Sequence, residues 1–181
     1  AALIAALIFF TLIGPRPDIA AAMETIRFPF KFFVTVALAV TAFAAIRILS
    51  RPGAESRPAL VALLLAPLLL AVAILLEMAA VPAESWGARL VGSNSLVCLS
   101  FIPLMGIGPL AVFIVALRAN APTRPRLAGA VAGLLAGGLA ATFYAAHCTD
   151  DSPLFVATWY TLAIAFLTAL GWWLSGRFVR W

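Results

Sequence analysis

Long apolar runs separated by short polar loops form the main pattern of this sequence. The runs cover residues 28–49, 59–81, 94–117, 127–146 and 153–175, and each contains few or no charged side chains. An α-helix rises about 1.5 Å per residue, so about 20 residues cross a hydrocarbon core of about 30 Å. The pattern therefore predicts five complete membrane-spanning helices. It shows none of the alternating ten-residue segments that are typical of a membrane barrel.

A shorter apolar run, residues 1–13, opens the chain. It lacks a basic segment and a small-residue cleavage site before Gly14, which disfavours a signal peptide. We interpret it as the end of a first membrane helix whose beginning, with an N-terminal cytoplasmic segment before it, is missing from this sequence. The expected fold is therefore all-α, a single polytopic membrane domain over residues 1–181 with six transmembrane helices, the first truncated at its start.

The composition agrees with a membrane domain and excludes an ordinary soluble enzyme. Hydrophobic residues make up 65% of the 181 residues and charged residues only 10%, against about 45–50% and about 25% in soluble domains. The net charge of +5 suits the ends of membrane helices better than a nucleic-acid surface. We expect no direct nucleic-acid binding, no enzymatic activity and no cofactor.

The basic residues gather at one side of the predicted membrane. Eight of them, with a single acid, Glu55, fall in loops or at the ends of apolar runs on that side: Arg47, Arg51, Arg57, Arg118, Arg124, Arg126, Arg177 and Arg180. The other side holds four bases and six acids: Arg16, Arg27, Lys31, Arg89, Asp18, Glu24, Glu77, Glu84, Asp150 and Asp151. Basic loops stay in the cytoplasm, so both the N-terminus and the C-terminus are predicted to be cytoplasmic.

Three charged side chains lie inside or close to the apolar runs. Lys31 and Arg47 stand near the ends of one run, where long side chains extend to the lipid headgroups, so both are expected to snorkel. Glu77 is about one turn from the end of its run. A hydrated carboxylate at the interface is favoured there over a proton or ion site.

A stripe of small residues runs along the fifth of the six predicted spans, residues 127–146. Gly129, Gly133 and Gly137 repeat every four residues and therefore share one helix face. Such a stripe lets a second helix approach closely. Packing within the chain is favoured over a dimer interface.

Two cysteines carry the candidate chemistry. Cys98 lies about one turn into its span and Cys148 follows the end of another, and the predicted topology brings both to the outer, non-cytoplasmic face. Disulfides form and persist in that compartment. Cys148 stands beside His147, the only histidine, and close to Asp150 and Asp151.

Three interpretations of the cysteines stay open. A disulfide or redox-responsive thiol pair is favoured by the compartment. A soft-metal site that uses Cys98, Cys148 and His147 is less favoured, because the ligands are few and their spacing matches no standard pattern. The thiols can also be unrelated buried side chains. No C-x-x-C pair is present, which argues against a disulfide-exchange enzyme.

The acids after Cys148 also have a structural interpretation. Ser152 followed by Pro153 is typical of a helix start, with Ser as the N-cap and Pro in the first turn. Asp150 and Asp151 are then expected beside the positive end of that helix dipole.

The segment from Tyr144 to Tyr160 resembles a bacterial membrane family. Its His-Cys-x-Asp-Asp-Ser-Pro core, with Cys98 upstream and the closing Arg-x-x-Arg-Trp, is similar to the NrsF-like anti-sigma factors, the negative regulators of sigma F. The resemblance covers nearly the whole chain. It implies six helices in the bacterial inner membrane, and Cys98 and Cys148 as the residues that sense stress. It also implies an N-terminal cytoplasmic segment, absent from this sequence, that binds an extracytoplasmic-function sigma factor.

These lines of reasoning lead to one hypothesis and two alternatives. The hypothesis is a membrane-bound anti-sigma factor that releases its sigma factor when periplasmic oxidants or heavy metals change the cysteine pair. A small six-helix transporter or channel is the first alternative, although clusters of buried charge that transport needs are not evident in the sequence. A membrane thiol oxidoreductase is the second.

Overall fold

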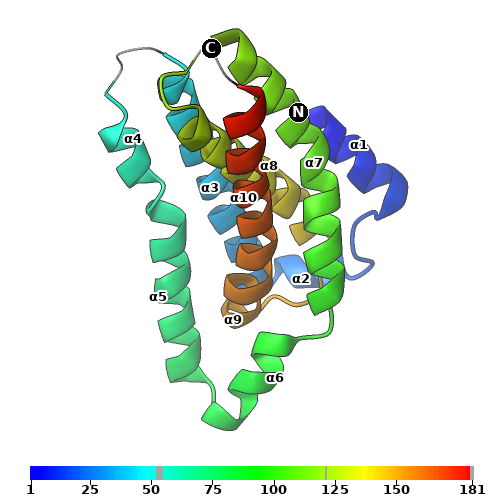
Figure 1. Cartoon of the computed structure of the whole chain (residues 1–181). Coiled ribbons are helices and arrows are strands. Elements are labelled where there is room, and N and C mark those ends of the chain that lie inside the picture. The colour runs from blue at the N-terminus through cyan, green and yellow to red at the C-terminus, as the bar shows by residue number, and fades with distance from the viewer. Residues whose placement is uncertain (52–54, 121, 180–181) are drawn as a thin grey trace.

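The computed structural model describes residues 1–51, 55–120 and 122–179, and these residues form helices joined by short connections (Figure 1). Arg180 and Trp181, which the sequence places at the basic side, lie outside the described residues. The elements in chain order are α1 (Ala2–Leu12), α2 (Ile19–Met23), α3 (Arg27–Leu49), α4 (Arg57–Ala62), α5 (Leu65–Ala80), the 3₁₀ turn η1 (Ala83–Ser85), α6 (Trp86–Val91), α7 (Ser95–Asn120), α8 (Pro125–Ala145), α9 (Pro153–Phe155), the π-helical turn η2 (Val156–Tyr160) and α10 (Thr161–Phe178).

Five helical segments are long and apolar enough to cross a membrane. They are Arg27–Leu49, Arg57–Ala80, Ser95–Asn120, Pro125–Ala145 and Pro153–Phe178, and they begin and end within a few residues of the five complete runs expected from the sequence. The α1 helix is shorter, with 11 residues. The all-helical class is therefore confirmed for the described residues, while the placement of the termini stays a prediction.

Two of these segments are interrupted rather than continuous. The amides of Leu63 and Leu64 bond to the carbonyls three residues earlier, at 3.2 and 3.0 Å, which separates α4 from α5. Pro67 has no N–H for the carbonyl of Leu63, and its ring crowds that carbonyl. The break therefore lies where a proline prevents a regular turn. The last segment contains the π-helical turn η2.

The α8 helix is the centre of the bundle and packs against α1, α3, α7 and α10. In the most apolar stretch of α8, 67% of the residues are buried, whereas in that of the α4–α5 segment only 11% are. Its glycines permit this: an added Cβ at Gly129 or Gly133 would overlap backbone atoms of α10, and one at Gly138 would lie 3.1 Å from the amide nitrogen of Ala39 on α3. Small residues thus bring two helix backbones close to α8.

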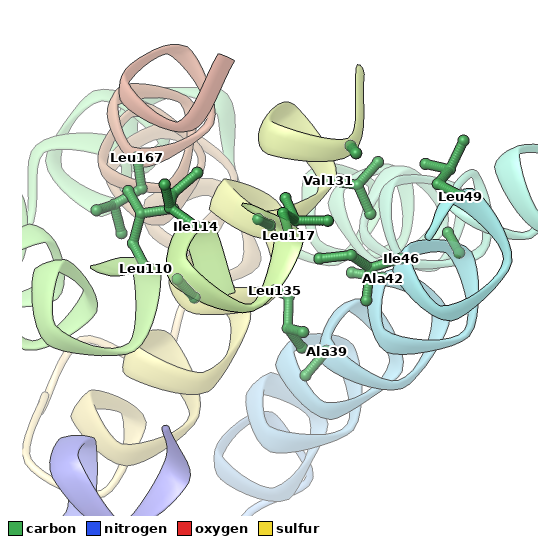
Figure 2. Packing of buried hydrophobic residues seen from close by; sticks show 14 of the residues in the cluster. Ala39, Ala42, Ile46, Leu49, Leu110, Ile114, Leu117, Val131, Leu135 and Leu167 are labelled. Carbon is green, nitrogen blue, oxygen red and sulfur yellow. The ribbon is translucent and has the colours of Figure 1, made fainter. Parts of the chain in front are cut away.

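One apolar core lies among α3, α7, α8 and α10 (Figure 2). Figure 2 shows side chains of all four helices meeting around α8, among them Ile46, Leu117, Leu135 and Leu167. In contrast, Leu75 and Leu76 of α5 are 67% and 66% exposed. An exposed apolar face of this kind is expected for a helix that contacts the hydrocarbon of a membrane.

The close approach at Gly133 generates a stability prediction. Gly133→Ala places a Cβ against the backbone of α10, so we expect a loss of about 1–3 kcal/mol, as for other overpacked sites. Gly87→Ala is the matched control, because an added Cβ at Gly87, in the α6 helix, meets nothing within 4 Å. Thermal unfolding in detergent micelles measures both. Equal melting temperatures for the two variants would contradict the packing described here.

Candidate functional site

The two thiols lie against each other at one end of the bundle, called here the thiol end. The Sγ atoms of Cys98, in the first turn of α7, and Cys148, in the loop after α8, are 3.9 Å apart. Both cysteines are free and fully buried. A disulfide bond measures about 2.05 Å, so the pair is in hydrogen-bond contact and a shift of about 2 Å separates it from a covalent link.

Cys148 is held by its own loop and by aromatic neighbours. Its amide donates to the carbonyl of Tyr144 at 3.0 Å, which extends the last turn of α8, and its thiol donates to the carbonyl of Asp150 at 3.7 Å. The cysteine pair shares its apolar surroundings with Tyr144, Phe155 and Tyr160. This packing excludes bulk water from the thiols.

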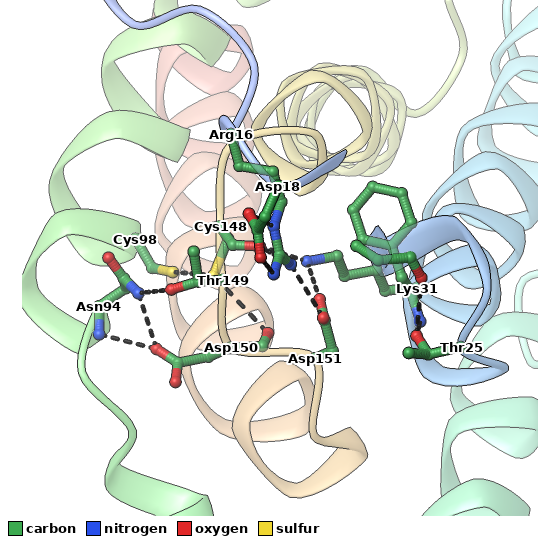
Figure 3. A network of polar contacts seen from close by, with 12 residues as sticks. Arg16, Asp18, Thr25, Lys31, Asn94, Cys98, Cys148, Thr149, Asp150 and Asp151 are labelled. Carbon is green, nitrogen blue, oxygen red and sulfur yellow. Dashed lines mark hydrogen bonds and ion pairs between the residues drawn. The ribbon is translucent and has the colours of Figure 1, made fainter. Parts of the chain in front are cut away.

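Two cationic side chains converge on the backbone of Cys148 (Figure 3). Its carbonyl oxygen accepts a hydrogen bond from Lys31 Nζ at 2.6 Å and one from Arg16 Nη1 at 3.3 Å. Arg16 also pairs with Asp151 at 2.9 Å and with Asp18 at 2.6 Å, and Lys31 pairs with Asp151. The loop that carries the thiol is therefore tied to α3 and to the segment between α1 and α2.

The snorkelling prediction for Lys31 was wrong. Lys31 is 1% exposed and turns into the protein, where the carboxylate of Asp151 and the Cys148 carbonyl take the place of lipid headgroups. A charge buried in a medium of low dielectric needs such partners. The prediction failed because Asp151 is 120 positions away in sequence.

Asp150 and Asp151, expected beside the dipole of the helix that follows them, make their polar contacts with other segments. Asp150 accepts hydrogen bonds from the amides of Ser93 and Asn94, at 3.0 and 2.8 Å, and from the Asn94 side chain at 3.0 Å. These groups precede α7, and the Asn94 carbonyl in turn accepts from the amide of Cys98 at 2.8 Å. Asp150 therefore fastens the Cys148 loop to the start of the helix that carries Cys98.

Glu77 is a buried link rather than the hydrated carboxylate expected from the sequence. It is 5% exposed and pairs with Arg89 at 3.2 Å and Arg27 at 3.5 Å. It also accepts from Ser152 Oγ at 2.6 Å and from the amide of Leu154 at 3.3 Å. Ser152 occupies the predicted N-cap position, but its side chain makes no cap bond, and Glu77 caps the helix instead.

His147 bonds to the segment after α1. Its Nδ1 lies 3.0 Å from the carbonyl oxygen of Gly14, on the segment after α1. Within the described ranges, no group of three or more His, Cys, Asp and Glu side chains is placed to hold a metal ion. The structure thus gives His147 a packing contact with the first helix and lends no support to a site of Cys98, Cys148 and His147.

The two thiols differ electrostatically. The hydrogen bond from Cys98, followed by the positive charge of Lys31, lowers the pKa of the Cys148 thiol from its ordinary value, against the opposing effect of burial. A lowered pKa raises the thiolate fraction, and the thiolate is the nucleophile and metal ligand. The surroundings of Cys148 therefore favour its thiolate form.

Sequence reasoning missed Arg16, Asn94 and the partners of Glu77. One signal was available for Arg16, because it is a cation directly after the Gly14-Pro15 break and its segment lies at the same predicted face as Asp151. Nothing in the sequence pattern marks Asn94 or Arg89.

The protein is a small bundle of apolar helices, and buried ion pairs at one end of the bundle hold the loop of its thiol pair. The family model for the negative regulator of sigma F, NrsF, matches residues 1–181, so the chain belongs to the NrsF family. It is 34% identical over 167 residues to the anti-sigma-F factor NrsF of Caulobacter vibrioides (strain NA1000 / CB15N), covering 92% of this chain and 78% of the relative. It is 35% identical over 179 residues to the probable anti-sigma-F factor NrsF of Azospira oryzae (strain ATCC BAA-33 / DSM 13638 / PS), covering 98% and 83%. No solved structure shows significant similarity to the chain.

The charge of Lys31 generates a prediction about thiol reactivity. In a Cys98→Ser background, where serine still donates a hydrogen bond, the rate of alkylation of Cys148 by iodoacetamide rises with pH as the thiolate forms. Lys31→Met removes the positive charge, so we expect the midpoint of this profile to move to higher pH. Lys31→Arg keeps the charge and should hold the midpoint close to that of the parent. An identical midpoint for Lys31→Met and the parent would show that Lys31 does not tune the thiol.

Proposed function

We propose that this protein is a membrane-bound anti-sigma factor that sequesters an extracytoplasmic-function sigma factor at the bacterial inner membrane. The match of the NrsF family model over the whole chain carries this proposal. Two relatives, one named as an anti-sigma-F factor and one as a probable anti-sigma-F factor, are each about a third identical and support it. The apolar helices supply the membrane anchor.

The charge distribution supports one orientation in the membrane. The end of the bundle opposite the thiols, called here the basic end, holds the end of α3, the start of α4, the end of α7, the start of α8 and the end of α10 (Figure 1). Its described basic residues are Arg47, Arg51, Arg57, Arg118, Arg124, Arg126 and Arg177. Under the positive-inside rule this end faces the cytoplasm, and both termini are cytoplasmic. The segment preceding residue 1 in the full-length protein then binds the sigma factor.

In the same orientation the thiol pair faces the periplasm and acts as the sensor. An oxidant such as hydrogen peroxide takes two electrons and two protons from Cys98 and Cys148, which leaves one disulfide and two molecules of water. The Cys148 thiolate attacks the peroxide and Cys98 then resolves the sulfenic acid, as in other paired thiols. A thiol-reactive heavy metal acts on the same two sulfurs by binding between them.

The contacts of Cys148 supply a route from the sensor to the cytoplasmic segment. Shortening the Sγ–Sγ distance from 3.9 Å moves the Cys148 loop, whose carbonyl is bound by Arg16 and Lys31. Arg16 follows α1, the helix that leads from the chain start. A signal biases a two-state protein only through different interactions with the two states, and the disulfide provides that difference.

The test uses the native-length protein, including what precedes Ala1, purified from its own membranes. We expect one sigma factor to copurify in equal amount under reducing conditions and to dissociate after peroxide treatment. Deletion of the preceding segment should abolish copurification.

Substitution of both cysteines tests the sensor separately from the binding activity. Cys98→Ser with Cys148→Ser should keep the sigma factor bound and abolish its release by peroxide, because no disulfide can form. A double variant that still releases sigma would remove the sensing role while leaving the anti-sigma function. Absence of any copurified sigma factor under reducing conditions would contradict the anti-sigma function itself.

A further inference from the structure

A long apolar cavity lies between the α5 helix and the rest of the bundle. Its volume is about 530 Å³, and its lining includes Leu38 of α3, Leu70 of α5, and Ile164 and Trp172 of α10. It follows the last helical segment from Tyr160, at the end of η2, to Trp172 of α10, which at 1.5 Å per residue is about 18 Å. One leaflet of bilayer hydrocarbon is about 15 Å thick. The cavity therefore has the length and polarity of an extended acyl chain.

A second cavity, called here the arginine cavity, adjoins the first at the basic end. It has a volume of about 750 Å³ and is lined by Thr123, Arg124 and Arg126, and it shares Ala130 and Trp172 with the apolar cavity. The two cavities are therefore neighbours along one face of the bundle. The arginine cavity lies where the headgroup of a lipid in the apolar cavity would be.

Two exposed arginines give the arginine cavity a positive charge. Arg124 and Arg126 make no ion pair with any acid in the described part of the chain, and Arg126 stacks over the Trp172 ring with its guanidinium carbon 4.7 Å from the ring centroid. Arg124 is the N-cap residue of the 21-residue α8 helix, which has no side-chain cap. The positive end of the helix dipole therefore adds to the two guanidinium charges.

We propose that these two cavities form a binding site for one anionic phospholipid of the surrounding membrane. Arg124 and Arg126 hold the phosphate, and one acyl chain fills the cavity between α5 and α10. Charge complementarity at one end and a chain-length apolar cavity at the other favour this occupant over a second protein helix, which is wider than a single acyl chain. The proposal requires that the helices span a bilayer and does not depend on sigma-factor binding.

The test measures lipid binding to the delipidated full chain in a neutral detergent. Native mass spectrometry counts bound dioleoylphosphatidylglycerol or dioleoylphosphatidylcholine, and thermal unfolding reports the accompanying stabilisation. We expect one phosphatidylglycerol to bind more tightly than phosphatidylcholine and to raise the melting temperature. Each arginine near an anionic headgroup contributes a factor of about five, so Arg124→Gln with Arg126→Gln should weaken this binding about 30-fold.

Two further variants distinguish a site from general charge attraction. Arg118→Gln with Arg177→Gln removes the same charge from the same end but neither residue lines these cavities, so phosphatidylglycerol binding should be retained. Ala165→Phe fills the apolar cavity from an exposed position of α10 and should displace the lipid with both cavity arginines intact.

Three results would overturn the proposal. Equal binding of phosphatidylcholine and phosphatidylglycerol would exclude a phosphate-selective site. An equal loss in the Arg118/Arg177 control would reduce the effect to overall charge. Full displacement of the lipid by inorganic phosphate, with no effect of Ala165→Phe, would show that the acyl chain does not occupy the apolar cavity.

Discussion

The carbonyl oxygen of Cys148 accepts two cationic donors in a place that bulk water does not reach, and the thiol end is arranged around that interaction. Lys31 and Arg16 are 1% and 8% exposed, so each needs a fixed counter-charge. Asp151 supplies it to both. Breaking such a buried pair by removing one partner typically costs about 3–5 kcal/mol. Two segments, α3 and the one between α1 and α2, are therefore held to a loop more than a hundred positions away, and that loop carries Cys148.

Close packing around α8 makes this arrangement possible. Because its glycines admit the backbones of α10 and α3, the α8 helix ends where α3 and the start of α7 converge, and Cys148 emerges beside Lys31 and Cys98. The α5 helix packs loosely by comparison, and its main polar link to the bundle is Glu77, which caps the last helical segment. The bundle thus combines a tight centre, which positions the thiols, with a loosely packed helix beside the cavity assigned to lipid.

The sequence was sufficient for the helices and insufficient for the polar contacts. Apolar runs of membrane-spanning length predict a helix with few alternatives, so the expected bounds of the five complete spans lie close to the observed ones. The topology also brought Cys98 and Cys148 to one face, because both stand at the same end of antiparallel spans. Lys31 and Glu77 were assigned to the lipid interface because their partners, Asp151 and Arg89, are distant in sequence or unmarked by any pattern. His147 could not be placed for the same reason, since its contact, Gly14, lies 133 positions earlier.

In the proposed mechanism, a change at the thiol pair reaches the first helix through Arg16. Hydrogen–deuterium exchange of the full-length protein, first fully reduced and then with the Cys98–Cys148 disulfide formed, measures whether it does. We expect faster exchange in α1 and in the segment to Asp18 in the disulfide form, and a smaller difference in Arg16→Gln. Differences confined to residues 94–98 and 147–150, with α1 unchanged, would contradict it.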